Sequence, residues 1–527
     1  MQYYLTINIV LVLFFLAFFF LIFQWLRQDF NLKEFFLVLL FSIGITFLFK
    51  YSFQFHFFGL EYEDSYIFNF SARQLFEKIY PISFLTDGIS VGSLSNPIST
   101  VTYGGHFITY PVFISWAYHV FGYNIHIPSY VNTFIEFLII LTLSISFKKV
   151  FGFNKYWFLP GIIFSLAPAM NVFGTTQLSE TFSSFIVLVS ILSFFYYFQS
   201  NKLIVLLIFG ICFFTAIITK RENMVLFCSF FLFSIYKSIT LKKNIIFSLL
   251  PIIVSFSFLI IYFLFIQNVF LIEKTESSEI STQTFSLSNF INLFPVFIQA
   301  LFKFNWFIIY LILIIASLIF ISIGWQKHPQ QLFLVISYVS YFIIYTLHYR
   351  SYYFVHFADV KPFEALRYLN NFFVISTLFI SFFIYKLLKI PNLKGVISPI
   401  LFVLFLISFV YTLLLRKEFS KMEVEDRFSS PVLVLKYLSE QKESVLITDN
   451  ILIFQLLGNR NLELVDLQIT EKLPCDFNNR NVYLFLSNFN KSKPFEYRYP
   501  PVFKKLQMMK KEEILKFGND DSLYKIK

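Results

Sequence analysis

Apolar segments long enough to cross a lipid bilayer recur along most of this 527-residue chain. A membrane-spanning helix needs about 20 apolar residues. We predict about twelve such segments, at 4–24, 35–51, 129–147, 157–172, 181–198, 203–219, 223–236, 245–267, 304–323, 331–347, 371–386 and 397–415. Charged residues make up only 14% of the chain, against about 25% in soluble domains. The predicted fold class is therefore an all-α polytopic membrane protein, and a soluble multidomain protein is excluded.

The loops between these segments fall into two alternating sets. One set carries thirteen Lys or Arg and two acidic residues, and the other carries ten basic and twelve acidic residues. Because basic loops remain in the cytoplasm, the second set and both chain ends are predicted to face outward. Topology then explains much of the net charge of +11, and no nucleic-acid partner is expected. We predict a multi-pass protein of the bacterial inner membrane; in a eukaryote the outer side would be the ER lumen.

The composition changes after residue 415. Residues 416–527 contain only short hydrophobic runs, with strands expected at 445–449, 462–467 and 482–486 and a short helix at 451–457. This alternation predicts a small α/β domain. The predicted domains are a membrane module at 1–415, whose first large outer loop (52–128) holds the catalytic residues, and an extracytoplasmic domain at 416–527.

An acidic cluster opens the first large outer loop. Glu61, Glu63 and Asp64 fall within four positions, and neighbouring carboxylates raise one another's pKa. A carboxyl group with a raised pKa suits a general base, although a solvated acidic turn fits the local sequence equally well. Downstream, 67–80 predicts an amphipathic helix and 110–121 a short apolar one, both lying along the membrane interface.

Several short motifs, each weak by itself, follow one another on the predicted outer side. They are Glu63-Asp64-Ser65-Tyr66-Ile67 with Ala72-Arg73, Tyr110-Pro111 to Phe121-Gly122, Ala167-Pro168 with Leu178-Ser179-Glu180-Thr181, Thr219-Lys220-Arg221-Glu222-Asn223, and Arg367-Tyr368. Over about 55–375 the chain resembles the GT-C class of membrane glycosyltransferases, which includes protein O-mannosyltransferases, aminoarabinose transferases and arabinofuranosyltransferase-like proteins. It departs from them in an extra N-terminal helix and in a Glu-Asp pair where many relatives have Asp-Asp or Asp-Glu.

The resemblance implies that a sugar is transferred from a polyprenyl-phosphate-linked donor at the outer membrane face. The acceptor would be a glycolipid, a polysaccharide or a protein, and a carboxylate would deprotonate its hydroxyl group. Asp64 is the predicted base, with Glu63 second. No cofactor is predicted with certainty, and a divalent metal is left open.

A lipid-phosphate leaving group needs cations to hold its charge. The candidates on the outer side are Lys220, Arg221, Arg350, Arg73 and Arg367. The alternative for each is contact with lipid headgroups.

Substrate-binding candidates complete the site. They are Glu180, Tyr66, His106, His348 and Tyr352. Glu180 is placed to meet Lys220 or the donor sugar, although a carboxylate at the start of a helix is also favoured by the helix dipole. The aromatic residues of 349–353 suit either sugar stacking or anchoring at the interface.

Two other functions compete with a transferase. A transporter or flippase for lipid-linked saccharides would need ionisable residues along a path through the membrane, and few are present. A polysaccharide polymerase or ligase on another fold would not predict the acidic pair at the start of the outer loop.

Overall fold

The three-dimensional structure is a computed structural model of the full chain. It describes residues 2–51, 63–78, 83–84, 91–93, 96–99, 101–102, 109–153, 155–167, 174, 176–240, 245–266, 287–288, 290–292, 294–295, 307–324, 329–347, 370–423, 429–441, 444–448, 453–454, 457, 462–466, 481–486, 510–517 and 521–526.

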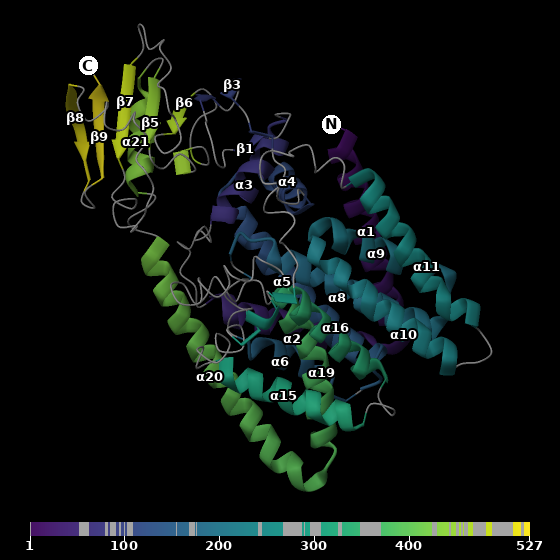
Figure 1. Ribbon diagram of the computed structural model, residues 1–527. Coiled ribbons are helices and arrows are strands. Elements are labelled where there is room, and N and C mark those ends of the chain that lie inside the picture. The colour runs from purple at the N-terminus through teal and green to yellow at the C-terminus, as the bar shows by residue number, and fades with distance from the viewer. Residues whose placement is uncertain are drawn as a thin grey trace. The chain divides into compact units, whose positions relative to one another are not determined.

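The chain forms two compact units, one of which contains 2–54 and 130–416. This membrane unit consists of long apolar helices (Figure 1). Its helices are α1 (Gln2–Asp29), α2 (Leu32–Tyr51), α5 (Ile127–Lys149), α6 (Leu159–Ser165), α8 (Glu180–Ser200), α9 (Leu203–Thr219), η1 (Arg221–Val225), α10 (Leu226–Thr240), α11 (Ile245–Ile261), η2 (Tyr262–Ile266), α15 (Phe307–Ile323), α16 (Pro329–Leu347), α19 (Asn370–Leu388) and α20 (Pro391–Glu423). Each of the twelve predicted segments overlaps one of them.

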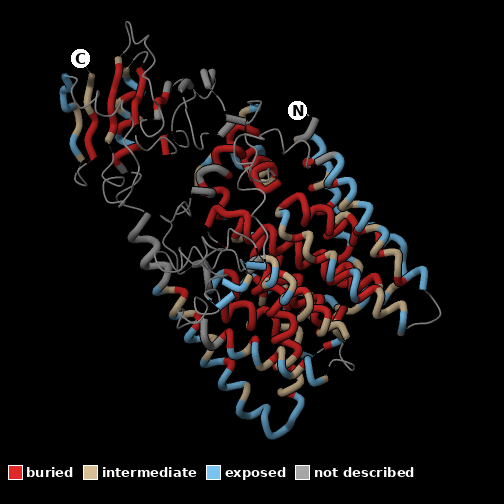
Figure 2. The backbone as a smooth tube through the Cα atoms, viewed as in Figure 1, coloured by how far each residue is buried: buried red, intermediate tan, exposed pale blue. Residues whose placement is uncertain are grey.

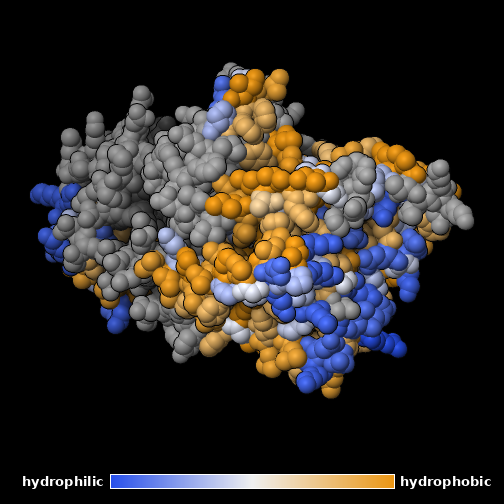
Figure 3. Space-filling view, turned by 90° about the horizontal axis from the view of Figure 1, so that it is seen from below, coloured by the Kyte–Doolittle hydropathy of each residue, from blue (hydrophilic) through white to orange (hydrophobic). Residues whose placement is uncertain are grey.

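Burial separates central from peripheral helices in the membrane unit (Figure 2). In the membrane-crossing stretch, 94% of α8 is buried inside the protein, against 17% of α20. Broad apolar areas lie on the surface (Figure 3), as expected where lipid takes the place of water. Among the described residues, seven helices are long and apolar enough to cross a membrane and three apolar helices are shorter. The structure therefore confirms an apolar helical protein, while the count of twelve spans stays a prediction.

Phenylalanine builds the centre of the membrane unit. The ring of Phe194 on α8 lies 4.5 Å from that of Phe230 on α10, 5.3 Å from that of Phe209 on α9 and 5.3 Å from that of Phe333 on α16, centroid to centroid. All four rings are buried. Aromatic pairs at such distances add to packing, so part of the large Phe content serves this core.

Ion pairs join two loops that the charge pattern places in the cytoplasm. Lys148 Nζ donates to Glu34 Oε2 at 2.8 Å, and Lys149 pairs with Asp29. The hydrogen bond from Lys148 holds the pKa of the Glu34 carboxyl below its ordinary value. These contacts place the loops 25–34 and 148–156 on the same side of the membrane, as the alternating pattern predicts.

The second compact unit combines 55–129 with 417–527. Its elements are α3 (Glu63–Phe76), α4 (Thr109–Phe121), α21 (Ser429–Ser439), β1 (Ser83–Phe84), β2 (Val91–Ser93), β3 (Asn96–Ser99), β4 (Val101–Thr102), β5 (Ser444–Thr448), β6 (Glu463–Asp466), β7 (Asn481–Leu486), β8 (Lys511–Lys516) and β9 (Ser522–Ile526). The predicted small α/β region is present, with its three predicted strands at β5, β6 and β7. In the predicted helix 451–457, residues 453, 454 and 457 are helical and the rest lie outside the described part.

One mixed sheet joins the outer loop to the tail. Its strand order is β3-β2-β6-β5-β7-β9-β8. Strands β5, β6 and β7 are parallel, and β2 from the outer loop runs antiparallel to β6, with Val91 opposite Val465. The outer loop and the tail therefore lie on the same side of the membrane. The sequence did not predict this pairing. The compact units separate after residue 416, and 55–129 is grouped with the tail.

The β2–β6 pairing predicts a specific disulfide. Residues directly opposite each other in an antiparallel pair have Cβ atoms about 4.5–5.5 Å apart, close to disulfide geometry. In a chain whose native cysteines are replaced by serine, Val91→Cys with Val465→Cys should form an intramolecular disulfide, detected by mass spectrometry of the linked peptides. Val91→Cys with Lys525→Cys, on β9 four strands away, should not. Equal cross-linking of the two pairs would contradict the pairing.

Candidate functional site

The acidic pair lies at the start of a helix. The sequence predicted a helix over 67–80, but α3 already begins at Glu63 and ends at Phe76, so Glu63 and Asp64 are its first two residues. Carboxylates in a first helical turn are stabilised by the helix dipole, which explains the earlier start. The side chains of Glu63, Asp64 and Tyr66 lie outside the described residues.

Helix α4 supports α3 from one side through a buried polar contact. The Tyr118 hydroxyl on α4 donates to Asn69 Oδ1 on α3 at 2.6 Å, and both residues are buried. Burial raises the pKa of the Tyr118 hydroxyl well above its ordinary value, so this hydroxyl remains a donor. Helix α4 ends at Phe121, and the next residue is Gly122, whose φ of +80° favours glycine. The predicted end of this helix is confirmed.

Arg73 is held within the α3–α4 pair. Its Nε lies 3.2 Å from Glu77 Oε1, and its guanidinium carbon lies 4.7 Å from the centre of the Tyr123 ring. The side chain is only 8% exposed. These contacts engage the guanidinium inside the protein, and phosphate binding by Arg73 stays a prediction.

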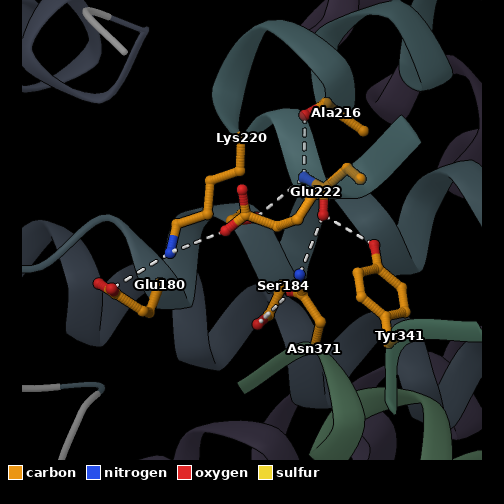
Figure 4. Close-up of polar contacts among 9 residues, drawn as sticks. Glu180, Ser184, Ala216, Lys220, Glu222, Tyr341 and Asn371 are labelled. Carbon is orange, nitrogen blue, oxygen red and sulfur yellow. Dashed lines mark hydrogen bonds and ion pairs between the residues drawn. The ribbon is translucent and has the colours of Figure 1, made fainter. Parts of the chain in front are cut away.

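A second charged group forms where α8 begins and α9 ends (Figure 4). Lys220 Nζ, just past α9, donates to Glu180 Oε1 at 3.1 Å and lies 3.9 Å from Glu222 Oε1. The exposed fractions of the side chains are 13% for Lys220, 5% for Glu180 and 27% for Glu222. Arg221 is exposed. The turn therefore holds two adjacent cations beside a buried carboxylate. The contact between Glu180 and Lys220 is the one that the sequence analysis considered.

The approach to Glu180 is fixed by α5. Asn132 Nδ2 on α5 donates to the carbonyl oxygens of Thr176 at 2.6 Å and Leu178 at 2.8 Å. These bonds fix the backbone that leads into α8. Glu180 Oε2 is buried and has no hydrogen-bond partner within the described part of the chain. This oxygen can accept a hydrogen bond from a bound group.

Sequence reasoning missed a buried amide network behind the cations. Asn223 contacts Ser183, Tyr341 and Asn371, and Asn371 contacts Ser184. In the sequence analysis Asn223 was only the last residue of the Thr219–Asn223 motif, and no role was predicted for it. The available signal was the isolated polar residues inside apolar helices, which generally pair across helices in membranes.

The remaining predicted site residues lie outside the described residues. They are His106, His348, Arg350, Tyr352 and Arg367. Within the described residues, no group of three or more His, Cys, Asp or Glu side chains is placed to hold a metal ion.

Comparison with solved structures identifies the architecture. The chain matches ArnT from Cupriavidus metallidurans bound to undecaprenyl phosphate with a TM-score of 0.58, and the apo form with 0.56. The fold resembles that of ArnT. In both cases the identity is 10%, and the match covers 93% of this chain and 97% of the other. This likeness concerns the fold, and at that level the architecture expected from the sequence is confirmed. No family model and no curated sequence matches the chain.

The Glu180–Lys220 pair makes a testable contribution to stability. Lys220→Met leaves a buried carboxylate without its cation and should lower the free energy of unfolding by about 3 kcal/mol. Glu222→Gln, at a more exposed and longer contact, should cost under about 1 kcal/mol. Adding Glu180→Gln to Lys220→Met should recover much of the loss. Thermal unfolding in detergent measures all four proteins, and equal losses for the two single variants would refute the ranking.

Proposed function

We propose that this chain is an integral-membrane glycosyltransferase of the GT-C type that uses a polyprenyl-phosphate-linked sugar. The observation that carries the proposal is the ArnT-like fold over 93% of the chain, together with undecaprenyl phosphate in one of the matched structures. The motifs that the sequence places on the outer side, between about 55 and 375, support it as well, because they occur in the order typical of that class. The proposed location is the bacterial inner membrane, with the tail on the periplasmic side.

The proposed reaction exchanges one bond at the sugar. An acceptor hydroxyl oxygen attacks the anomeric carbon, the bond from that carbon to the phosphate oxygen breaks, and its electron pair leaves on the polyprenyl phosphate. Asp64 or Glu63 takes the hydroxyl proton as general base. The acceptor is a glycolipid, a polysaccharide or a protein.

The charged turn supplies the chemistry that the leaving group needs. Lys220 and Arg221 are assigned to the donor phosphate, where cations stabilise the developing charge. Arg350 and Arg367 are assigned to the same role from the sequence. Glu180 holds Lys220 through one carboxylate oxygen, and its other oxygen is assigned to a hydroxyl or amino group of the donor sugar.

The base assignment predicts a large, specific loss of activity. Asp64→Asn should reduce sugar transfer about 10²- to 10⁴-fold, measured with a lipid-linked sugar in proteoliposomes. Insertion and thermal stability should be unchanged. Asp87→Asn, a carboxylate of the same loop, is the matched control and should retain activity. Full activity in both Asp64→Asn and Glu63→Gln would disprove the assignment.

The same variants separate the transferase from a flippase. A flippase would move the lipid-linked sugar between leaflets without forming a glycosidic bond. We expect Asp64→Asn to stop product formation while donor distribution across the bilayer is unaffected.

A further inference from the structure

Asn223 lies at the centre of a fully buried hydrogen-bond network. Its Nδ2 donates to Ser183 Oγ at 3.1 Å and to the Ala216 carbonyl oxygen at 2.9 Å. Its Oδ1 accepts from the Tyr341 hydroxyl at 2.7 Å and from Asn371 Nδ2 at 3.0 Å. An asparagine amide has two donor hydrogens and an oxygen with two lone pairs, so these four bonds use its whole capacity.

The network connects four helices to one short turn. Ser183 belongs to α8, Ala216 to α9, Tyr341 to α16 and Asn371 to α19, while Asn223 belongs to η1. All five residues are buried, so the loss of one partner would leave a buried polar group unsatisfied. The position of Asn223 is therefore fixed from four directions.

Asn223 also closes the turn that carries the two cations. The Ala216 carbonyl oxygen accepts from the Lys220 backbone N–H at 3.1 Å as well as from Asn223 Nδ2. The Asn223 backbone N–H donates to the Lys220 carbonyl oxygen at 3.1 Å. The backbone on both sides of Arg221 is thus tied to the buried amide.

Helix α8 links the network to the ion pair. Glu180, Ser183 and Ser184 are spaced i, i+3 and i+4, so they share one face of α8. Glu180 pairs with Lys220, Ser183 accepts from Asn223, and the Ser184 hydroxyl donates to Asn371 Oδ1 at 3.0 Å. The same helix face therefore holds both the ammonium group and the amide behind it.

We propose that Asn223 is a positioning residue which, with Tyr341 and Asn371, orients Lys220 and Arg221 toward the phosphate of the lipid-linked donor. This inference rests on the proposed function, in which those two cations bind the phosphate. It assigns the orientation of two adjacent cations to a buried neutral amide.

The test compares two buried tyrosines in the full-length protein. Tyr341→Phe removes one hydrogen bond from Asn223. Tyr310→Phe is the matched control, because Tyr310 is also fully buried and its hydroxyl contacts Ser376 and Thr377 on α19. Both variants should melt at lower temperature. Only Tyr341→Phe should raise the Kd for undecaprenyl phosphate, by about fivefold, measured by native mass spectrometry. Equal Kd changes in both variants, or none in Tyr341→Phe, would overturn the proposal.

Asn223→Asp and a double variant complete the test. Asn223→Asp keeps an oxygen for Tyr341 but replaces the two N–H donors to Ser183 and Ala216 with a carboxyl group that has at most one O–H, and it should weaken binding more than Tyr341→Phe. In a Lys220→Met background, the effect of Tyr341→Phe on Kd should be smaller than in the unmodified protein, because only Arg221 is left for the network to position. Additive effects would overturn the positioning role alone. Unchanged Kd in Lys220→Met itself would instead show that the phosphate assignment fails, and the inference with it.

Discussion

Polar groups inside an apolar helical protein depend mainly on partners within the chain, and this constraint shapes the membrane unit around Asn223. A buried amide or hydroxyl group that lacked a hydrogen-bond partner would cost several kcal/mol. Asn223 meets the requirement through partners on four helices. The helix ends around Lys220 are consequently fixed where the chain leaves the apolar interior.

Polar and aromatic contacts have different roles in the membrane unit. The Phe194 cluster packs α8, α9, α10 and α16 without any directional demand. The amide network, which joins α8, α9, α16 and α19 through Asn223, is directional, because a hydrogen bond forms only within a narrow range of angles. Packing therefore holds the helices together, and hydrogen bonds set the rotation of α8 that brings Glu180 to Lys220.

Local signals in the sequence predicted the helices, but they did not predict contacts between residues that are far apart in the chain. Apolar runs predicted the positions of the apolar helices, because such runs consist of consecutive residues. The start of α3 was misplaced by four positions, since a carboxylate pair resembles a turn as much as a first helical turn. The Asn223–Tyr341 contact joins residues 118 positions apart, and a single sequence carries no record of such proximity. The strand β2 was missed for the same reason.

The mixed sheet constrains the order in which parts of the protein can fold during synthesis. Strand β2 lies near the N-terminus, and its partner β6 is translated only after the whole membrane unit has been made. At about 5–20 residues per second, the outer loop waits tens of seconds with an open strand edge. A ribosome that stops before β6 would release a chain with its membrane helices complete and its outer loop unfinished. The outer loop can therefore complete its part of the sheet only after β6 has been translated.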